Sequence, residues 1–224
     1  MELREYMSVR RAYNLVRQET ESAYRLTFEE FAILCRLDVM EVPVKTSDIA
    51  EYQGALRPTM THRTNHLANL GYIDRSEGPV DRRNIVCSIS EKGHEYVAEL
   101  AKGTRSKIPV GQPLARTSAE RICKYVDTMG SVYCTAGQLV MLALYMDDDE
   151  QSTITSLVER LGLLQPTVSM SVGSLTKRGL VARPHIEGSS ARSTFVVLTE
   201  EGRESIQVLV DKIVRLVVRR RPRM

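Results

Sequence analysis

The sequence repeats itself once over a long distance. Thr27 and Thr135 begin two segments, residues 27–75 and 135–183, that align without a gap. The shared landmarks are Gly54/Gly162, Pro58/Pro166, Leu67/Leu175 and Gly71/Gly179. Solenoid repeats recur every 20 to 50 residues or so and need about three copies for stability. Two copies of a longer segment therefore indicate a duplicated domain.

Within each copy, the pattern predicts a helix-turn-helix. Threonine followed three residues later by Glu or Gln is typical of a capping box at the start of a helix. A short helix, a glycine suited to the left-handed conformation, and a helix with proline in its first turn come next. These elements are predicted at residues 27–37, 47–52, 54 and 58–71 in the first copy, and at 135–146, 156–161, 162 and 166–179 in the second.

Strands and terminal helices complete each copy. Short apolar runs at residues 72–73 and 85–89, and at 180–181 and 194–198, predict strand pairs joined by a polar loop, the wing. Amphipathic helices are expected at residues 2–24, 90–102, 117–128 and 200–220. The predicted fold is mainly α with small β wings (α+β). It consists of two tandem winged helix-turn-helix domains, 1–103 and 113–224, joined by a linker at 104–112.

Composition excludes several classes of protein. No apolar run approaches the roughly 20 residues that a membrane-spanning helix needs, and the charged start of the chain does not resemble a secretory signal. The four cysteines form no CxxC pair, so we expect a reduced, cytoplasmic setting with no metal and no cofactor. The net charge of +3 neither requires nor excludes nucleic acid.

The first copy resembles the MarR family of bacterial regulators. The resemblance rests on five motifs in order: Thr27-Phe28-Glu29-Glu30-Phe31, Arg57-Pro58-Thr59-Met60-Thr61-His62, Leu67 to Arg75, Asp81-Arg82-Arg83 and Ser90-Glu91-Lys92-Gly93. MarR proteins are homodimeric winged-helix repressors or activators whose terminal helices form the dimer interface, and many respond to small phenolic ligands or oxidants. The resemblance covers nearly the whole chain, twice.

This resemblance implies a sequence-specific regulator of transcription that binds double-stranded DNA. We expect a repressor that a small-molecule effector or an oxidant releases. Because the two units are fused, the chain should act as a monomer that forms a pseudo-dimer. Its two recognition helices should then lie about one DNA turn apart.

The second helix of the first motif has a polar face suited to DNA. Helical spacing places Met60, Thr64 and Leu67 on one side and polar residues on the other. Asn can pair with adenine, His can donate to purines, and residues near the helix start can reach phosphates. The candidate DNA contacts are Arg57, Thr59, Thr61, His62, Asn65, His66 and Asn69. The alternatives are a solvated helix face, or a zinc site at His62 and His66 that lacks the metalloprotease Glu.

In the second copy, the corresponding helix is less polar. Its predicted buried face is Val168, Val172 and Leu175, and its candidate DNA contacts are Gln165, Thr167, Ser169, Met170, Ser174 and Lys177. The first copy should supply most hydrogen bonds to bases, and the second should supply phosphate contacts and a thymine-methyl contact from Met170. The operator is therefore expected to contain two unlike half-sites.

The wings supply further candidate contacts. Arg82 and Arg83 follow Asp81, as in the family's wing, where an arginine enters the minor groove and an acidic residue orients it. The second wing keeps Arg192 but has Ser190 where the acid would stand. A surface charge cluster without a role is the alternative for both wings.

Other functions remain open. A winged-helix interaction module that has lost DNA binding is the main alternative, because the second recognition helix is weakly polar. An enzyme is not expected, since the sequence has no nucleophile elbow, phosphate-binding glycine loop or metal-ligand spacing. Cys123 and Cys134 fall in the region where oxidant-sensing relatives keep a reactive thiol, but buried, inert thiols are the favoured interpretation.

Overall fold

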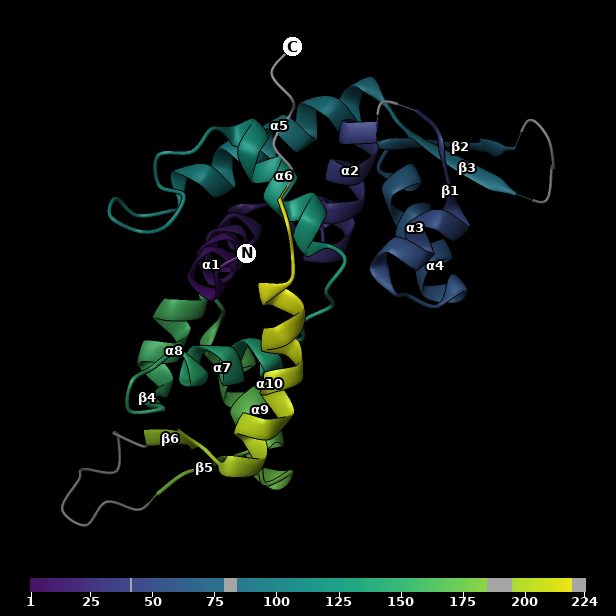
Figure 1. The fold of residues 1–224 in the computed structure, drawn as a ribbon. Helices are drawn as coiled ribbons and strands as arrows, with labels where there is room; N and C mark the ends of the chain where they lie inside the picture. Colours follow the sequence, from purple (N-terminus) through teal and green to yellow (C-terminus); the bar gives the residue numbers. More distant parts are fainter. Residues whose placement is uncertain (41, 79–83, 185–194, 219–224) are drawn as a thin grey trace. The chain divides into compact units, whose positions relative to one another are not determined.

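The protein divides into two compact units (Figure 1). The computed structural model describes residues 1–224 except 41, 79–83, 185–194 and 219–224. The first-repeat unit comprises Val16–Tyr133 and Leu216–Met224, and the second-repeat unit comprises Met1–Leu15 and Cys134–Arg215. Neither unit is one continuous stretch of chain. The domain bounds 1–103 and 113–224, which follow the duplication, stay a prediction.

The described residues of both units are mainly helical, with one small antiparallel sheet in each. In the first-repeat unit the elements are η1 (Ser22–Tyr24), α2 (Phe28–Met40), β1 (Val44–Lys45), α3 (Thr46–Gln53), α4 (Arg57–Asn69), β2 (Ile73–Glu77), β3 (Ile85–Ile89), α5 (Glu91–Ser106) and α6 (Ala119–Met129). In the second they are α7 (Ala136–Tyr145), β4 (Gln151–Thr153), α8 (Ile154–Leu161), α9 (Gln165–Lys177), β5 (Val181–Ala182), β6 (Phe195–Leu198) and α10 (Glu200–Val214). Helix α1 (Leu3–Glu19) contributes residues to both units.

Each sheet has three strands in the same relative order. The orders are β1-β3-β2 and β4-β6-β5, all antiparallel. The β2–β3 pairing runs from Ile73 opposite Ile89 to Glu77 opposite Ile85. The sequence patterns missed β1 and β4, because strands of two and three residues are too short to show an alternation of apolar and polar positions.

Both predicted capping boxes are present. The Thr27 backbone N–H donates to the Glu30 carboxylate at 2.7 Å, and the Glu30 N–H donates to the Thr27 hydroxyl at 3.2 Å. Thr135 and Gln138 make the same reciprocal pair at the start of α7. These bonds satisfy backbone donors that the first turn of a helix leaves without partners.

The predicted left-handed glycines are also confirmed. Gly54 ends α3 with φ of 58° and Gly162 ends α8 with φ of 60°. Glycine adopts this conformation without the steric cost that a Cβ atom imposes. The turn between the two helices of each motif is therefore built in the same way in both copies.

Several helix ends differ from the prediction. Helix α1 ends at Glu19, not at residue 24, and the Arg25 guanidinium donates to the carbonyls of Gln18 and Thr20 near that end. Helix α10 ends at Val214 rather than near residue 220, since its buried stripe stops at Ile213 and Val217 is exposed. Helix α5 continues through Gly103 to Ser106 because Thr104 is still buried, so part of the predicted linker is helical.

Each unit takes a helical segment from the other half of the sequence. Helix α6, which follows the predicted linker, packs against α2 and α5 of the first-repeat unit. The N-terminal part of α1 joins the second-repeat unit, where Arg11 donates to the Glu159 carbonyl and Asn14 to the Leu161 carbonyl, both at 2.8 Å. The two units are thus interleaved along the chain.

The core of each unit centres on one apolar helix. Phe31, Ile33 and Leu34 of α2 are completely buried, and so are Val140 and Leu142 of α7. In the described parts of the chain, we find no helix with the length and apolarity that crossing a bilayer requires.

Candidate nucleic-acid interface

Helix α4 is anchored by one buried face. Met60, Thr64 and Leu67 are fully buried, as predicted, and the Thr64 hydroxyl donates to the Met60 carbonyl at 3.0 Å. The helix packs against α3, α2 and β2, and Pro58 lies in its first turn. Because three elements pack against the buried face of the helix, its exposed face is held in a defined orientation.

That remaining face carries most of the predicted contact residues. The exposed ones are Arg57, Thr59, Thr61, His62, Asn65 and Asn69. They come from one helix and include a cation, hydroxyls, an imidazole and amides. A surface of this composition can hydrogen-bond to phosphates and to base edges.

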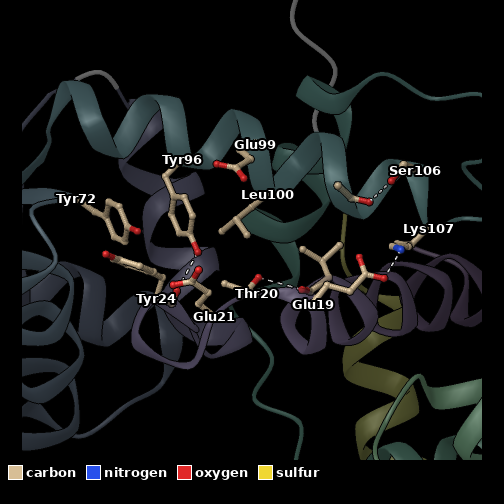
Figure 2. A pocket seen from close by; sticks show the side chains of 12 residues that line it. Glu19, Thr20, Glu21, Tyr24, Tyr72, Tyr96, Glu99, Leu100, Ser106 and Lys107 are labelled. Atoms are coloured by element: carbon tan, nitrogen blue, oxygen red, sulfur yellow. Dashed lines mark hydrogen bonds and ion pairs between the residues drawn. The ribbon is translucent and has the colours of Figure 1, made fainter.

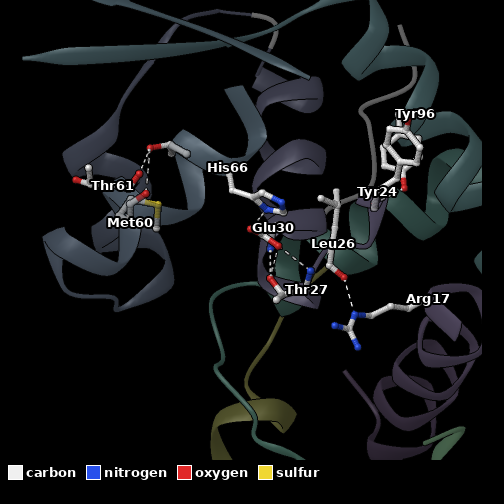
Figure 3. Close-up of polar contacts among 10 residues, drawn as sticks. Arg17, Tyr24, Leu26, Thr27, Glu30, Met60, Thr61, His66 and Tyr96 are labelled. Carbon is white, nitrogen blue, oxygen red and sulfur yellow. Dashed lines mark hydrogen bonds and ion pairs between the residues drawn. The ribbon is translucent and has the colours of Figure 1, made fainter. Parts of the chain in front are cut away.

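His66 differs from its neighbours because it is tied to a buried carboxylate. Its Nδ1 atom lies 2.7 Å from Oε1 of Glu30, whose side chain is only 5% exposed (Figure 3). The other carboxylate oxygen of Glu30 accepts hydrogen bonds from the Thr27 backbone N–H and hydroxyl. Glu30 therefore links the cap of α2 to α4, and only part of the His66 ring remains exposed.

Two further contacts support the α4 surface. The Arg75 guanidinium of β2 donates to the Asn65 side-chain oxygen. Arg63 donates to Gln53 at 2.7 Å, and Gln53 donates to the Glu29 carbonyl at 2.8 Å. The side-chain oxygen of Asn65 is therefore engaged within the protein, and its amide N–H groups remain as donors for an outside partner.

Sequence reasoning did not identify Glu30, Gln53 and Arg75 as supports of this surface. The capping box identified Glu30 as part of the start of α2, but this local pattern does not show that its second carboxylate oxygen contacts His66 of α4. The hydrogen bonds of Gln53 and Arg75 join residues of different helices and strands, so a local sequence pattern does not predict them.

Helix α9 presents a different surface. Val168, Val172 and Leu175 are buried, as predicted, and Met170 is 70% exposed. Gln165, Ser174 and Lys177 are exposed, while Thr167 and Ser169 are half-buried. Ser174 stands at the position of His66, and Gln138 at that of Glu30, so the histidine–carboxylate contact of the first copy has no counterpart here.

The wing arginines cannot be placed. Arg82, Arg83 and Arg192 lie outside the described residues. Their predicted contacts with the minor groove stay predictions.

The cysteines are all buried. Cys35 of α2 lies beside Cys123 of α6, and burial raises the pKa of the Cys35 thiol well above its ordinary value. Cys134 is buried as well. The expected burial of Cys123 and Cys134 is confirmed, and burial limits the access of reagents to these thiols.

Comparison with known proteins gives a family match inside the first copy and several related regulators. Residues 26–85 match the model of the MarR family. The chain is 27% identical over 88 residues to the HTH-type transcriptional regulator SarT of Staphylococcus aureus, covering 38% of this chain and 75% of SarT. It is 42% identical over 48 residues to an HTH-type transcriptional regulator of Mycobacterium tuberculosis, covering 21% of this chain and 31% of that protein.

Among solved structures, the YusO protein of Bacillus subtilis covers 45% of this chain and 67% of its own, with 21% identity and a TM-score of 0.36. The family match begins just before α2, contains the whole helix-turn-helix, and ends at the first residue of β3. Residues 26–85 are a MarR family domain.

Proposed function

We propose that this chain is a transcription regulator that binds double-stranded DNA through helix α4. The observation that carries the proposal is the exposed polar face of α4, which lies inside the segment that matches the MarR family. The relatives named as HTH-type transcriptional regulators support the same function. A helix anchored on one face and polar on the other suits insertion into the major groove.

We further propose that the second copy contributes a second, unlike DNA contact, so that one chain acts as a pseudo-dimer. The repeated order of helices and strands supports two DNA-binding surfaces, one in each copy. The difference between α4 and α9 supports unlike half-sites, since α9 has Met170 and Ser174 at the positions of the two α4 histidines, His62 and His66. In this proposal a repressor is released by a small effector, because the buried thiols disfavour oxidation as the signal.

The first test is selection of binding sites from random duplex DNA at two salt concentrations. We expect a motif with two unlike halves and an affinity that falls as salt rises, because phosphate contacts release counterions. Asn65→Ala should relax one half of the motif and Met170→Ala the other. A good bidentate base contact is worth about 1–3 kcal/mol. Because Arg75 occupies the Asn65 side-chain oxygen, Asn65→Ala should weaken binding at the low end of this range, by roughly fivefold.

A matched control separates base reading from general charge. Lys102→Ala removes an exposed cation from α5, away from α4, and should leave the selected motif unchanged. Changing Arg82 and Arg83 together to alanine should weaken binding and reduce its salt dependence. A perfect palindrome would contradict unlike half-sites. Weak binding at low salt with no motif would favour the interaction-module alternative.

A further inference from the structure

A cavity of about 640 Å³ lies within the first-repeat unit, away from the exposed face of α4. Its walls come from the C-terminal end of α1, from η1, from Tyr72 after α4, and from α5. Figure 2 shows three tyrosines, Tyr24, Tyr72 and Tyr96, gathered at one end, and Glu19 with Lys107 at the other. The volume falls within the range of about 300–1,000 Å³ that small-molecule sites occupy.

The aromatic end is held in place by contacts of its own. The Tyr72 and Tyr96 rings stack with centroids 4.3 Å apart, and the Tyr96 hydroxyl donates to the Tyr24 carbonyl at 2.9 Å. Burial raises the pKa of both Tyr72 and Tyr96, so both phenols stay neutral at physiological pH. The rings therefore offer neutral aromatic surface, which attracts cations at the ring faces.

The charges of the cavity are mostly negative. Three carboxylates line it, from Glu19, Glu21 and Glu99, against one lysine, Lys107. Lys107 is already paired with Glu19. One further cation lies nearby, since the Lys92 ammonium sits 5.0 Å from the centroid of the Tyr72 ring, while donating to the Leu70 carbonyl. The chain itself thus places a cation against this aromatic cluster.

We propose that this cavity binds an organic cation that carries aromatic or other apolar groups. The tyrosine cluster supplies apolar surface and cation–π attraction, and Glu21 and Glu99 supply opposite charge at the rim. An aromatic carboxylate of the same shape would meet these acids unfavourably. Cation binding goes beyond the proposed regulation of transcription and does not require it.

The position of Tyr72 suggests what binding would change. Tyr72 lies two residues beyond the C-cap of α4 and its side chain packs on Tyr96 of α5. A ligand seated against this pair contacts the junction through which α4 connects to β2. If ligand-bound and DNA-bound states prefer different arrangements of this junction, the two ligands must weaken each other by the same factor. This coupling rests on the proposed function, whereas the binding does not.

Calorimetric titration of the full chain with two ions of matched shape tests the proposal. Tetraphenylphosphonium and tetraphenylborate differ in charge sign and hardly in shape. We expect tetraphenylphosphonium to bind at least about tenfold more tightly than tetraphenylborate, because the carboxylates of Glu21 and Glu99 attract the cation and repel the anion. Glu21→Gln and Glu99→Gln should each weaken its binding by up to about fivefold, the size of one exposed ion pair.

Glu95→Gln is the matched control. Glu95 is an exposed acid on α5, one turn before Glu99, and it does not line the cavity. Its replacement should leave the affinity within experimental error. Equal affinity for both ions, no binding of tetraphenylphosphonium, or equal effects of Glu95→Gln and Glu99→Gln would overturn the proposal. Because these titrations contain no DNA, a chain that binds the cation and no DNA would refute only the proposed regulation.

Discussion

The equivalent glycines Gly54 and Gly162 offer a matched test of how α1 packs in the second-repeat unit. Both have left-handed backbone conformations, with φ near 60°. A Cβ atom at Gly54 would meet nothing within 4 Å, whereas one at Gly162 would lie 2.7 Å from the Arg11 carbonyl oxygen and 3.1 Å from Leu15. The same substitution is therefore strained in both copies and also sterically blocked in the second.

The expected losses of stability follow from these two terms. An L-residue in the left-handed conformation costs about 1–2 kcal/mol, and this cost applies to both Gly54→Ala and Gly162→Ala. Crowding of a packed site adds roughly 1–3 kcal/mol, and this applies to Gly162→Ala alone. The gain from a stiffer unfolded chain is the same for both variants and cancels in the comparison. Gly162→Ala should therefore lose about 1–3 kcal/mol more than Gly54→Ala.

Urea denaturation of both variants measures the difference in their free energies of unfolding. A double-mutant cycle with Asn14→Ala tests whether this difference comes from the packing of α1. Asn14→Ala removes the hydrogen bond from α1 to the Leu161 carbonyl and should cost about 1 kcal/mol on its own. If Gly162→Ala displaces α1, Asn14→Ala should cost less in that background. Equal losses for the two glycine variants, together with strict additivity, would refute the packing of α1 on this unit.

Three further predictions concern the first-repeat unit. Glu30→Gln keeps an oxygen for the cap, as Gln138 does in α7, so the free energy of unfolding should change by less than about 1 kcal/mol in a denaturation measurement. DNA affinity, measured by binding titration, should fall because the buried carboxylate that orients His66 is lost. Burial raises the pKa of Asp127, so wild-type stability relative to Asp127→Asn should fall as pH rises through that raised pKa, and a pH-independent difference would contradict this. Alkylation of Cys35 by iodoacetamide should be very slow in the native protein and fast in urea, as peptide mass mapping would report.

The helix-turn-helix could be predicted because its signals are local. Capping boxes, left-handed glycines and a proline in the first turn each act within a few residues, and all of these lie where expected. The buried face of α4 followed from helical spacing alone. The polar face followed for the same reason, since residues on the side of the helix opposite Met60, Thr64 and Leu67 must point outward.

The remaining features depend on contacts between distant residues. One such feature is the placement of the N-terminal part of α1 and of α6 in the units of the other half of the sequence. The apolar stripe of an amphipathic helix shows that one face is buried, but it does not show which segment packs against that face. The contact between His66 and Glu30 is another, since the spacing that puts His66 on the polar side of α4 does not show that a buried carboxylate of α2 faces it. For the same reason, no pattern predicted the tyrosine cluster, which joins three separate elements.

The two copies share an order of helices and strands but differ in the chemistry of their exposed surfaces. The positions that hold each copy together are conservatively matched: Met60, Thr64 and Leu67 correspond to Val168, Val172 and Leu175, and both sets are buried. Exposed positions carry little of the folding free energy, so they can diverge at small cost. Gln138 and Ser174 stand at the positions of Glu30 and His66, so α7 keeps a side-chain acceptor for its cap while α9 has no histidine to contact it. The two helices therefore differ both in their exposed residues and in the contacts that hold those residues, and this difference is the structural basis of the proposal that they read different DNA.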